Sequence, residues 1–591
     1  MKWYMNIKLS TAAILTVGSF YTSNLLAEDI PDVQKPAQGT HDQIIEVGSD
    51  MNAELGENDM KMVELVDLMV EQKILKKEAA ELFKNNIQHE ANKRFEAKAM
   101  QAKQLSDAEN EAQNFSGVRV NHIPRFVKDE IRDSLRIGMQ EDVVAAVMSQ
   151  AKNEAWAIPD SWPTWLNRLT FNSDFRFRME SEAFGDGNSV QEYFDYNHIN
   201  NKGIFDPEDR DAFLNTTKDR DRMRLRARFG FKAKISEKVS TEFRLATGNT
   251  NTPVSTNQTL GDEFNKYTVT FDRVAFKWKS VDVDNYPWLD LHVGRFKNPF
   301  ISTDLVWDGD INFDGLAFNY RQNLRGSNNL FDMDRRDRTL LFTAGVFPLK
   351  EFEYSSSDRW LLGTQIGTEF ILTDQSNLTF ALSYYNYINM EGKVNASDTN
   401  YQDVTAPDFM QKGNTVFNIA RSSDTDPGSI AKKYALASDY DLINLTMNFD
   451  IASFAPEHLI LNLDYVKNIG FDKDKTAKKL LESGDTNGAA FVGDRTDGYQ
   501  ISLLYGWTKI NKVRDWNFQL GYKYLEADAV VDAYTDSDFH GGGSDARGWW
   551  VKAAYGIEEN TAVSIKYIDT SEIDYTPLRQ SLLQLDLTTF F

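Results

Sequence analysis

The sequence predicts an all-β transmembrane barrel of about 16 antiparallel strands, preceded by a mainly α-helical periplasmic segment. Apolar and polar residues alternate from Leu169 to the end of the chain, as in strands with one apolar and one wet face. Beyond the N-terminus no run of about 20 apolar residues occurs, so a membrane protein with this sequence would cross as strands. We therefore divide the chain into a signal peptide (1–27), a flexible lead (28–56), a helical periplasmic segment (57–165) and the barrel (166–591).

The last ten residues carry the clearest alternation. Leu583, Leu585 and Leu587 lie on one side, and Gln584 and Asp586 lie on the other. A chain that finishes on two phenylalanines without a polar tail is unusual for a water-soluble domain, whose termini are normally solvated. A strand that closes a barrel in lipid would account for both features.

Composition narrows the function classes. The chain has 591 residues, a formal net charge of −23, 12% aromatic residues and no cysteine. The acidic balance argues against nucleic acid as a partner, because a phosphate backbone attracts cationic surfaces. Without cysteine there is no disulfide, no thiol nucleophile and no lipoprotein anchor.

The N-terminal residues resemble a secretory signal peptide. Lys2 and Lys8 form the charged region, an apolar stretch follows, and cleavage is expected after Ala27. A membrane anchor is the alternative, although serine and threonine residues dilute the apolar run. We expect an exported protein whose mature part begins with the flexible lead.

A helical pattern begins near Met60. Apolar residues recur at three- and four-residue steps through Val63, Val66 and Val70, and a Lys- and Glu-rich run continues to Gln113. The segment could form a helical hairpin or a coiled coil that trimerises the protein, or a solvated helix with no larger partner. Tryptophans and prolines around residues 159–165 then end the helical pattern, where the chain is expected to meet the bilayer.

Sixteen segments with a period of two follow. They are expected near 169–179, 222–234, 239–247, 267–279, 288–296, 314–320, 339–347, 360–371, 378–388, 441–450, 458–466, 499–507, 515–525, 548–556, 561–569 and 582–591. Long and short connections mostly alternate along the chain, as in barrels with long outer loops and short periplasmic turns. Both ends of the barrel are therefore expected on the periplasmic side. One connection, about 321–338, is too long for this rule.

A soluble β-sandwich or soluble barrel is the competing architecture, because it also alternates. There the apolar rows would meet in a dry core. The signal peptide, the aromatic content and the terminal Phe591 favour the membrane barrel, in which every second side chain touches hydrocarbon and its neighbours touch water.

Several stretches of the sequence are distinctive: residues 165–168 (Trp-Leu-Asn-Arg) through 175–180, 271–278, 291–300 and 304–310. They resemble stretches of the Gram-negative outer-membrane proteins called putative porins. The resemblance extends over the helical segment and the barrel. It implies a barrel in the outer membrane of a Gram-negative bacterium, and its functional implication is general, because the solutes of the family are mostly undefined.

An arginine ladder is the most unusual set of residues expected to face the lumen. Its members lie on the first two strands: Arg176, Arg178, Arg222, Arg224, Arg226 and Arg228. Like charges on neighbouring strands repel one another, so acidic groups are expected to neutralise the arginines. One answer is local neutralisation, by Asp174, Glu180, Asp219 and Asp221.

The other answer is the third outer loop, about 297–313. It carries the candidate constriction acids Asp304, Asp308 and Asp310, with Asp314 just beyond. In general porins, which this chain is similar to in strand count, the third loop folds into the lumen and sets acids against a basic wall. A calcium site of the EF-hand type is not expected, because Asn319 occupies the twelfth position where an acid is needed.

Three other functions stay open. An enzyme acting on lipids has no motif here, and His292 and Ser383 are only inward-facing candidates. A receptor or structural barrel would need a plug, which residues 60–150 could supply. The acidic outer loops, including Asp532, Asp536, Asp538 and the glycines at 541–543, could bind divalent cations that bridge lipopolysaccharide, or could simply be solvated.

We therefore expect an outer-membrane porin that passes small hydrophilic solutes passively, with a weak preference for anions. No cofactor or metal is required. Its expected partners are outer-membrane lipid and lipopolysaccharide, and a homotrimer is a further expectation, because trimers are common among similar porins.

Overall fold

A computed structural model describes residues 166, 168–248, 250–282, 286–325, 338–354, 356–372, 376–421 and 430–591. The expected signal peptide, flexible lead and helical periplasmic segment (1–27, 28–56 and 57–165) lie outside the described residues. All described residues belong to the barrel expected over 166–591.

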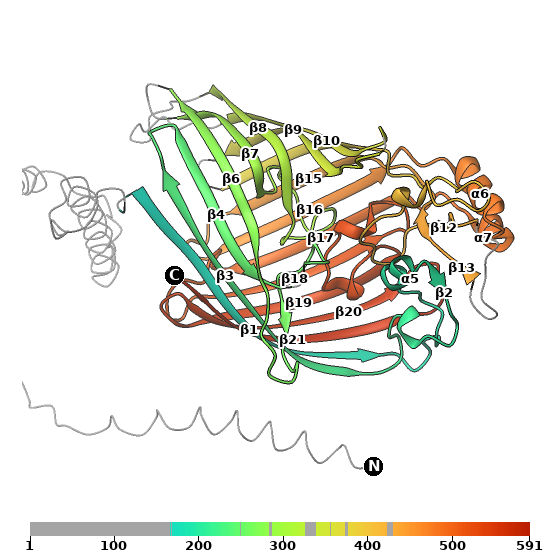
Figure 1. Cartoon of the computed structure of the whole chain (residues 1–591). Coiled ribbons are helices and arrows are strands. Elements are labelled where there is room, and N and C mark those ends of the chain that lie inside the picture. Colours follow the sequence, from blue (N-terminus) through green and yellow to red (C-terminus); the bar gives the residue numbers. More distant parts are fainter. Residues whose placement is uncertain are drawn as a thin grey trace, which may run out of the picture. The chain divides into compact units, whose positions relative to one another are not determined.

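One antiparallel sheet forms the barrel wall (Figure 1). It has seventeen strands among the described residues, of which β5 (Gln258–Thr259) is only two residues long. The sixteen long strands match the expected ones in order. They are β1 (Leu169–Phe184), β3 (Arg220–Lys234), β4 (Val239–Thr247), β6 (Val269–Val281), β7 (Pro287–Lys297), β8 (Asn312–Arg325), β9 (Arg338–Lys350), β10 (Arg359–Ile371), β11 (Asn377–Ile388), β15 (Asp441–Ile451), β16 (His458–Asn468), β17 (Asp497–Gly506), β18 (Trp516–Leu525), β19 (Ala546–Glu558), β20 (Thr561–Glu572) and β21 (Arg579–Phe590).

The sheet closes between its first and last long strands. β1 pairs with β3 on one side and with β21 on the other, so that Phe177 lies opposite both Leu225 and Leu587. The terminal residue takes part in the seam, because Phe591 and Ser173 exchange backbone hydrogen bonds of 2.8 and 3.0 Å. A closed sheet has no unpaired edge, which excludes the open two-sheet sandwich that the sequence left as an alternative.

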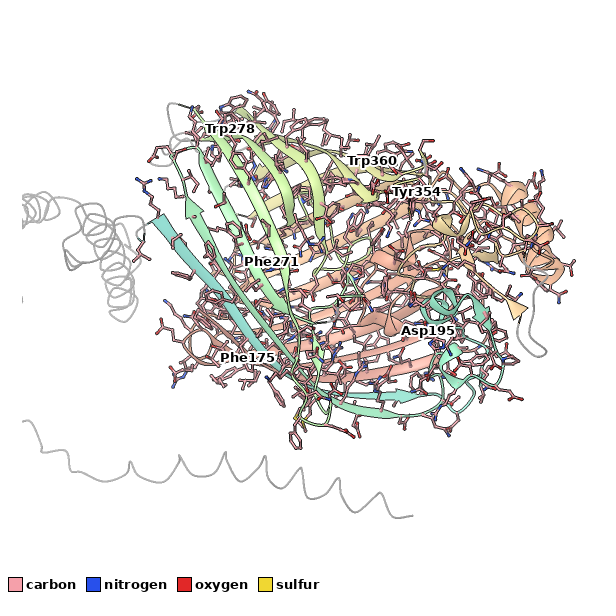
Figure 2. All side chains as sticks on the ribbon, in the orientation of Figure 1. Phe175, Asp195, Phe271, Trp278, Tyr354 and Trp360 are labelled. Carbon is pink, nitrogen blue, oxygen red and sulfur yellow. The ribbon has the colours of Figure 1, made fainter. Side chains whose placement is uncertain are left out.

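The two faces of the wall differ in composition. In β15, Leu445 is 47% exposed on the outer face, whereas its neighbour Asn444 is fully buried on the inner face. Phe175 and Phe271, labelled in Figure 2, are two further exposed residues of the outer rows. Large apolar side chains exposed in rows on the outside of a closed barrel form a lipid-facing surface.

Two strand pairs extend beyond the predicted bounds. β1 and β3 continue to pair Glu182 with Arg220, where charged residues have replaced the apolar alternation. β8 and β9 likewise run on to Arg325 and from Arg338, which shortens the overlong connection to residues 326–337, outside the described part. Hydropathy marks the band in contact with lipid, and backbone pairing continues past it.

The long connections gather at the end of the barrel opposite the C-terminus (Figure 1). They contain α5 (Tyr196–Lys202), α6 (Lys473–Glu482), α7 (Thr486–Phe491), and the paired short strands β2 (Ile204–Phe205) with β13 (Ile430–Ala431) and β12 (Val416–Asn418) with β14 (Tyr434–Leu436). Turns of 3₁₀ helix occur at η2 (Arg210–Ala212), η3 (Asp403–Thr405), η4 (Asp532–Tyr534) and η5 (Phe539–Gly541). Among the described helices, none is both long and apolar enough to cross a bilayer.

Candidate functional site

The connection between β7 and β8, residues 298–311, is fixed to inward-facing side chains of the barrel wall; we call it the inward loop. The amide of Gln365 in β10 accepts a hydrogen bond from the Ile301 N–H at 2.9 Å and donates to the Ile301 carbonyl at 2.8 Å. Asp464 in β16 accepts from the backbone N–H and the hydroxyl of Thr303, at 3.3 and 2.6 Å. The inward loop is therefore tied to strands far from it in the sequence.

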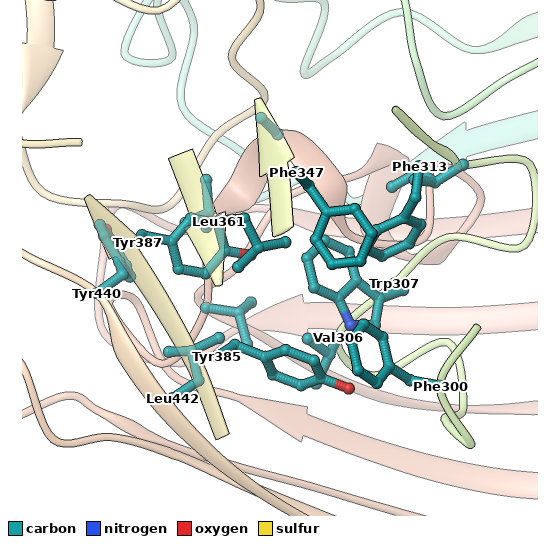
Figure 3. Packing of buried hydrophobic residues seen from close by; sticks show 14 of the residues in the cluster. Phe300, Val306, Trp307, Phe313, Phe347, Leu361, Tyr385, Tyr387, Tyr440 and Leu442 are labelled. Carbon is teal, nitrogen blue, oxygen red and sulfur yellow. The ribbon is translucent and has the colours of Figure 1, made fainter. Parts of the chain in front are cut away.

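The inward loop packs on a cluster of apolar side chains of the wall, which we call the apolar seat (Figure 3). It includes Phe313, Phe347 and Tyr385. Phe300 packs against Tyr385 of β11 with ring centroids 5.1 Å apart, and Trp307 packs against Phe313 of β8 at 4.9 Å. Phe347 of β9 completes the group and is only 1% exposed. Each such side chain stabilises the packing by about 1.5–3 kcal/mol.

The apolar seat corrects one expectation. From the sequence, every inward side chain is expected to touch water, but inward residues such as Phe347, Leu361, Tyr385 and Leu442 are at most 1% exposed. Their neighbours Val346, Leu362, Tyr384 and Ile443 are exposed on the outer face. At these positions both faces of the strands are apolar, because the inner face packs against the inward loop.

Two of the candidate acids on the inward loop meet cations. Asp304 accepts a hydrogen bond from Gln500 at 2.6 Å and lies 3.6 Å from Lys523. Asp310 pairs with the ladder residue Arg228 at 3.2 Å. Burial opposes ionisation of Asp310, but the neighbouring Arg226 and Arg228 outweigh it and lower the pKa of this carboxyl.

The other two acids have different surroundings. Asp308 is 8% exposed and accepts a hydrogen bond from the Ser537 N–H at 3.0 Å. Burial and the nearby Asp536 carboxylate raise the pKa of Asp308 to about 8. Asp314 lies in β8, is half exposed, and pairs with Arg295 at 2.7 Å, away from the ladder.

The arginine ladder spans β1 and β3 in register. Arg176 lies opposite Arg226 and Arg178 lies opposite Arg224, so like charges do stand on neighbouring strands. Five of the six arginines have an acidic partner among the described residues. The pairs are Arg178 with Asp586 (2.7 Å) and Asp538 (2.9 Å), Arg222 with Glu180, Arg224 with Glu180 (3.6 Å), Arg226 with Asp174 (2.9 Å), and Arg228 with Asp174 (2.6 Å) and Asp310 (3.2 Å).

The positive charges of the ladder are thus neutralised both by acids on the barrel strands and by acids from loops. Asp174 and Glu180 neutralise it as expected of the local answer. Asp219 and Asp221 do not take part, because they accept hydrogen bonds from the Phe184 N–H at 3.0 Å and the Ser181 hydroxyl at 2.6 Å. Arg176 forms no ion pair within the described part of the chain and donates a hydrogen bond to Asn257 at 2.5 Å.

The connection between β18 and β19, residues 526–545, also folds inward, contrary to the expectation of a solvated or lipopolysaccharide-binding outer loop. Asp532 is 2% exposed and accepts a hydrogen bond from the Gln411 N–H at 3.1 Å. Asp538 pairs with Arg178 inside the barrel. The acidic residues are buried because they satisfy amides and cations of the lumen, so they are unavailable to cations at the membrane surface.

Three lysines that the sequence analysis did not single out belong to the same region. Lys523 is 2% exposed and lies between Asp304 and Asp536, at 3.6 and 3.9 Å. Lys552 and Lys566 face each other across β19 and β20, and both line a cavity with Arg176 and Arg178. Each follows an apolar residue in a lipid-facing row, and that alternation could have identified them.

The two candidates for catalysis do not meet. The ring of His292 in β7 packs against Phe296 with centroids 5.3 Å apart. The hydroxyl of Ser383 in β11 accepts a hydrogen bond from the Gln365 amide at 2.8 Å. Both residues therefore have structural contacts, and the described residues contain no cluster of acids and histidines able to hold a metal ion.

A closed antiparallel barrel with an apolar outer surface and a charged lumen defines an outer-membrane barrel of the porin type. The sequence matches the family described as Putative porin over residues 59–591. The chain therefore belongs to the putative porin family, which makes it a porin channel of the outer membrane and not an enzyme.

Solved structures with remote likeness are also porins and channels. Pseudomonas putida OprB at high pH is 11% identical with a TM-score of 0.38, covering 72% of this chain and 94% of that chain. Acinetobacter baumannii DcaP, an outer membrane channel (10%, 0.35), and Salmonella typhi OmpF in complex with daunomycin (10%, 0.36) each cover 72% of this chain and 97% of theirs. At this similarity they add nothing to the family assignment. No curated protein matches the sequence.

The raised pKa of Asp308 gives stability a definite dependence on pH. An unfolded chain releases this proton near pH 4, whereas the folded protein keeps it up to about pH 8. The folded state binds more protons in that window, so the contribution of Asp308 to stability falls as pH rises from about 4 to about 8.

Replacing Asp308→Asn should therefore flatten the decline in the free energy of unfolding between pH 5 and 8, as measured by urea titration in lipid vesicles. Asp314→Asn is the matched control, because it removes a carboxylate from an exposed ion pair. If the free energy of unfolding falls equally in wild type and in Asp308→Asn over this range, Asp308 is not protonated in the folded protein.

Proposed function

We propose that this porin passes small hydrophilic solutes passively through a lumen narrowed by the inward loop, with the arginines of β1 and β3 along one wall. The observation that carries the proposal is the anchoring of residues 298–311 to the inner face of the wall by Gln365 of β10 and Asp464 of β16. A constriction that is held by the wall keeps its shape while solutes pass.

The charges around the inward loop are only partly balanced. Asp310 pairs with Arg228 at 3.2 Å and Asp304 lies 3.6 Å from Lys523, whereas Arg176, Lys552 and Lys566 on the wall have no acidic side chain within 4.0 Å among the described residues. Unbalanced cations on a wall of low dielectric act strongly on charged solutes. Because most of the arginines are paired, we expect only a weak preference for anions, carried by the unpaired cations.

The position of the barrel ends supports a periplasmic location for the N-terminal segment. β1 begins at Leu169 beside the terminal Phe591, at the end opposite the long connections (Figure 1). Long connections are the outer loops in barrels of this type. We therefore propose that residues 57–165 precede the barrel on the periplasmic side and that lipid and lipopolysaccharide surround it.

A barrel closed by its own loops is the second candidate. Residues 529–531 of the connection between β18 and β19 are at most 2% exposed, so this connection fills part of the lumen. A sealed lumen would suit a receptor or a structural barrel.

Purified full-length protein in a planar bilayer separates these functions. Stepwise conductance in KCl is expected for the porin. A tight seal without conductance would favour the receptor, and a seal with hydrolysis of the lipid would favour an enzyme.

The role of the wall is tested by Arg176→Glu, since among the described residues Arg176 forms no ion pair that the change would break. Under a salt gradient the cation-to-anion permeability ratio should rise about fivefold, because a unit charge at about 4 Å in water is worth about 1 kcal/mol. Lys234→Glu, at the exposed end of β3, is the control and should change the ratio little. An unchanged reversal potential in Arg176→Glu would mean that this wall does not border the conducting path.

A further inference from the structure

The lumen cavity between β1, β17, β19 and β20 has a composition that selects a particular class of solute. Its volume is about 470 Å³, which suits a small organic molecule. We infer that it is a binding site for small hydroxylated monocarboxylates. The inference rests on the proposed channel function, because a solute must enter this cavity through the lumen.

Unpartnered cations line one side of the cavity. Lys552 and Lys566 stand opposite each other in the register of β19 and β20, and neither has an acidic side chain within 4.0 Å among the described residues. Arg176 also lacks an acidic partner there. Like charges on paired strands repel each other, and an anion between them would relieve that repulsion.

The acids that line the same cavity are already engaged. Asp538 and Asp586 both pair with Arg178, at 2.9 and 2.7 Å. Asp304 binds Gln500 and Lys523. They cannot also neutralise Lys552, Lys566 and Arg176 by direct contact.

The charge balance sets the charge of the solute. Four cations line the cavity (Arg176, Arg178, Lys552 and Lys566), against three acids (Asp304, Asp538 and Asp586). The excess is one positive charge, so a monoanion completes the balance and a dianion would be repelled by the acids. A neutral solute would supply no negative charge to balance the lysines.

Two buried polar atoms define the rest of the solute. The Nε of Arg176 is a donor and the Oε1 of Gln500 is an acceptor, and neither has a hydrogen-bond partner among the described residues. A carboxylate would accept from Arg176, and a hydroxyl on the same molecule would donate to Gln500. The side chains of Arg176 and Gln500 line the same cavity, although these two atoms are themselves buried. With a rotation of each side chain toward the cavity, a hydroxy acid of a few carbons would satisfy the donor, the acceptor and the charge together.

Gluconate is the test solute, with sorbitol as the neutral polyol and hexanoate as the carboxylate without hydroxyls. In single-channel recordings of the full-length protein in KCl, gluconate should block the current at concentrations where sorbitol has no effect and hexanoate has much less. Block by gluconate no stronger than block by sorbitol would overturn the inference, and equal block by hexanoate would overturn the requirement for hydroxyls. In both cases a conducting channel leaves the proposed function standing, whereas absence of any channel would refute the proposed function itself.

The double variant Lys552→Gln with Lys566→Gln should raise the half-blocking concentration of gluconate about tenfold or more while channels still open in KCl. The double variant Lys552→Arg with Lys566→Arg keeps the charge and should retain block, which separates loss of the site from loss of folding. Lys234→Gln, at the exposed end of β3, is the matched control. Undiminished block in the glutamine variant would show that these lysines do not form the site.

Discussion

Hydrogen bonding between β1 and its two neighbours, β3 and β21, closes the sheet, and the rest of the structure depends on this closure. In hydrocarbon no water is available to satisfy a free strand edge, so a barrel is stable only when its first and last strands pair. The backbone bonds between Ser173 and Phe591 show that pairing continues to the last residue. Once the wall is closed, the residues of its outer rows must be apolar because they contact lipid. The residues of its inner rows are not constrained by lipid and can be polar, charged or apolar.

The inner rows serve two different purposes. On β8 to β11 and β15 they include apolar residues that pack with Phe300 and Trp307 of the inward loop (Figure 3), and polar residues such as Gln365 that hydrogen-bond to it. On β1, β3, β19 and β20 they are charged, and they include both paired arginines and unpaired lysines. The apolar contacts of the loop and the charged residues thus lie on different strands of the wall, and this asymmetry underlies the proposed constriction.

The lipid made the strands predictable from the sequence, because it imposes the same alternation on every one of them. The alternation predicted that the ladder residues share one face, whereas their register, with Arg176 opposite Arg226, is known only from the pairing of β1 and β3. Contacts within the lumen were harder to predict from the sequence. Doublets such as Val346 with Phe347, or Tyr384 with Tyr385, mark strands that are apolar on both faces, yet they do not reveal what covers the inner one. The partners Asp538 and Asp586 lie about 360 and 408 positions from Arg178, and no local pattern links residues so far apart.

The central claim is that alternate side chains of the barrel wall face water in the lumen and lipid outside. The chain contains no cysteine, so single cysteines can be introduced and labelled without interference. In β20, Lys566→Cys should react rapidly with a water-soluble maleimide that cannot cross the membrane, whereas Ile565→Cys, in the exposed outer row, should stay unlabelled until the protein is unfolded. Rapid labelling of Ile565→Cys with protection of Lys566→Cys would contradict the account.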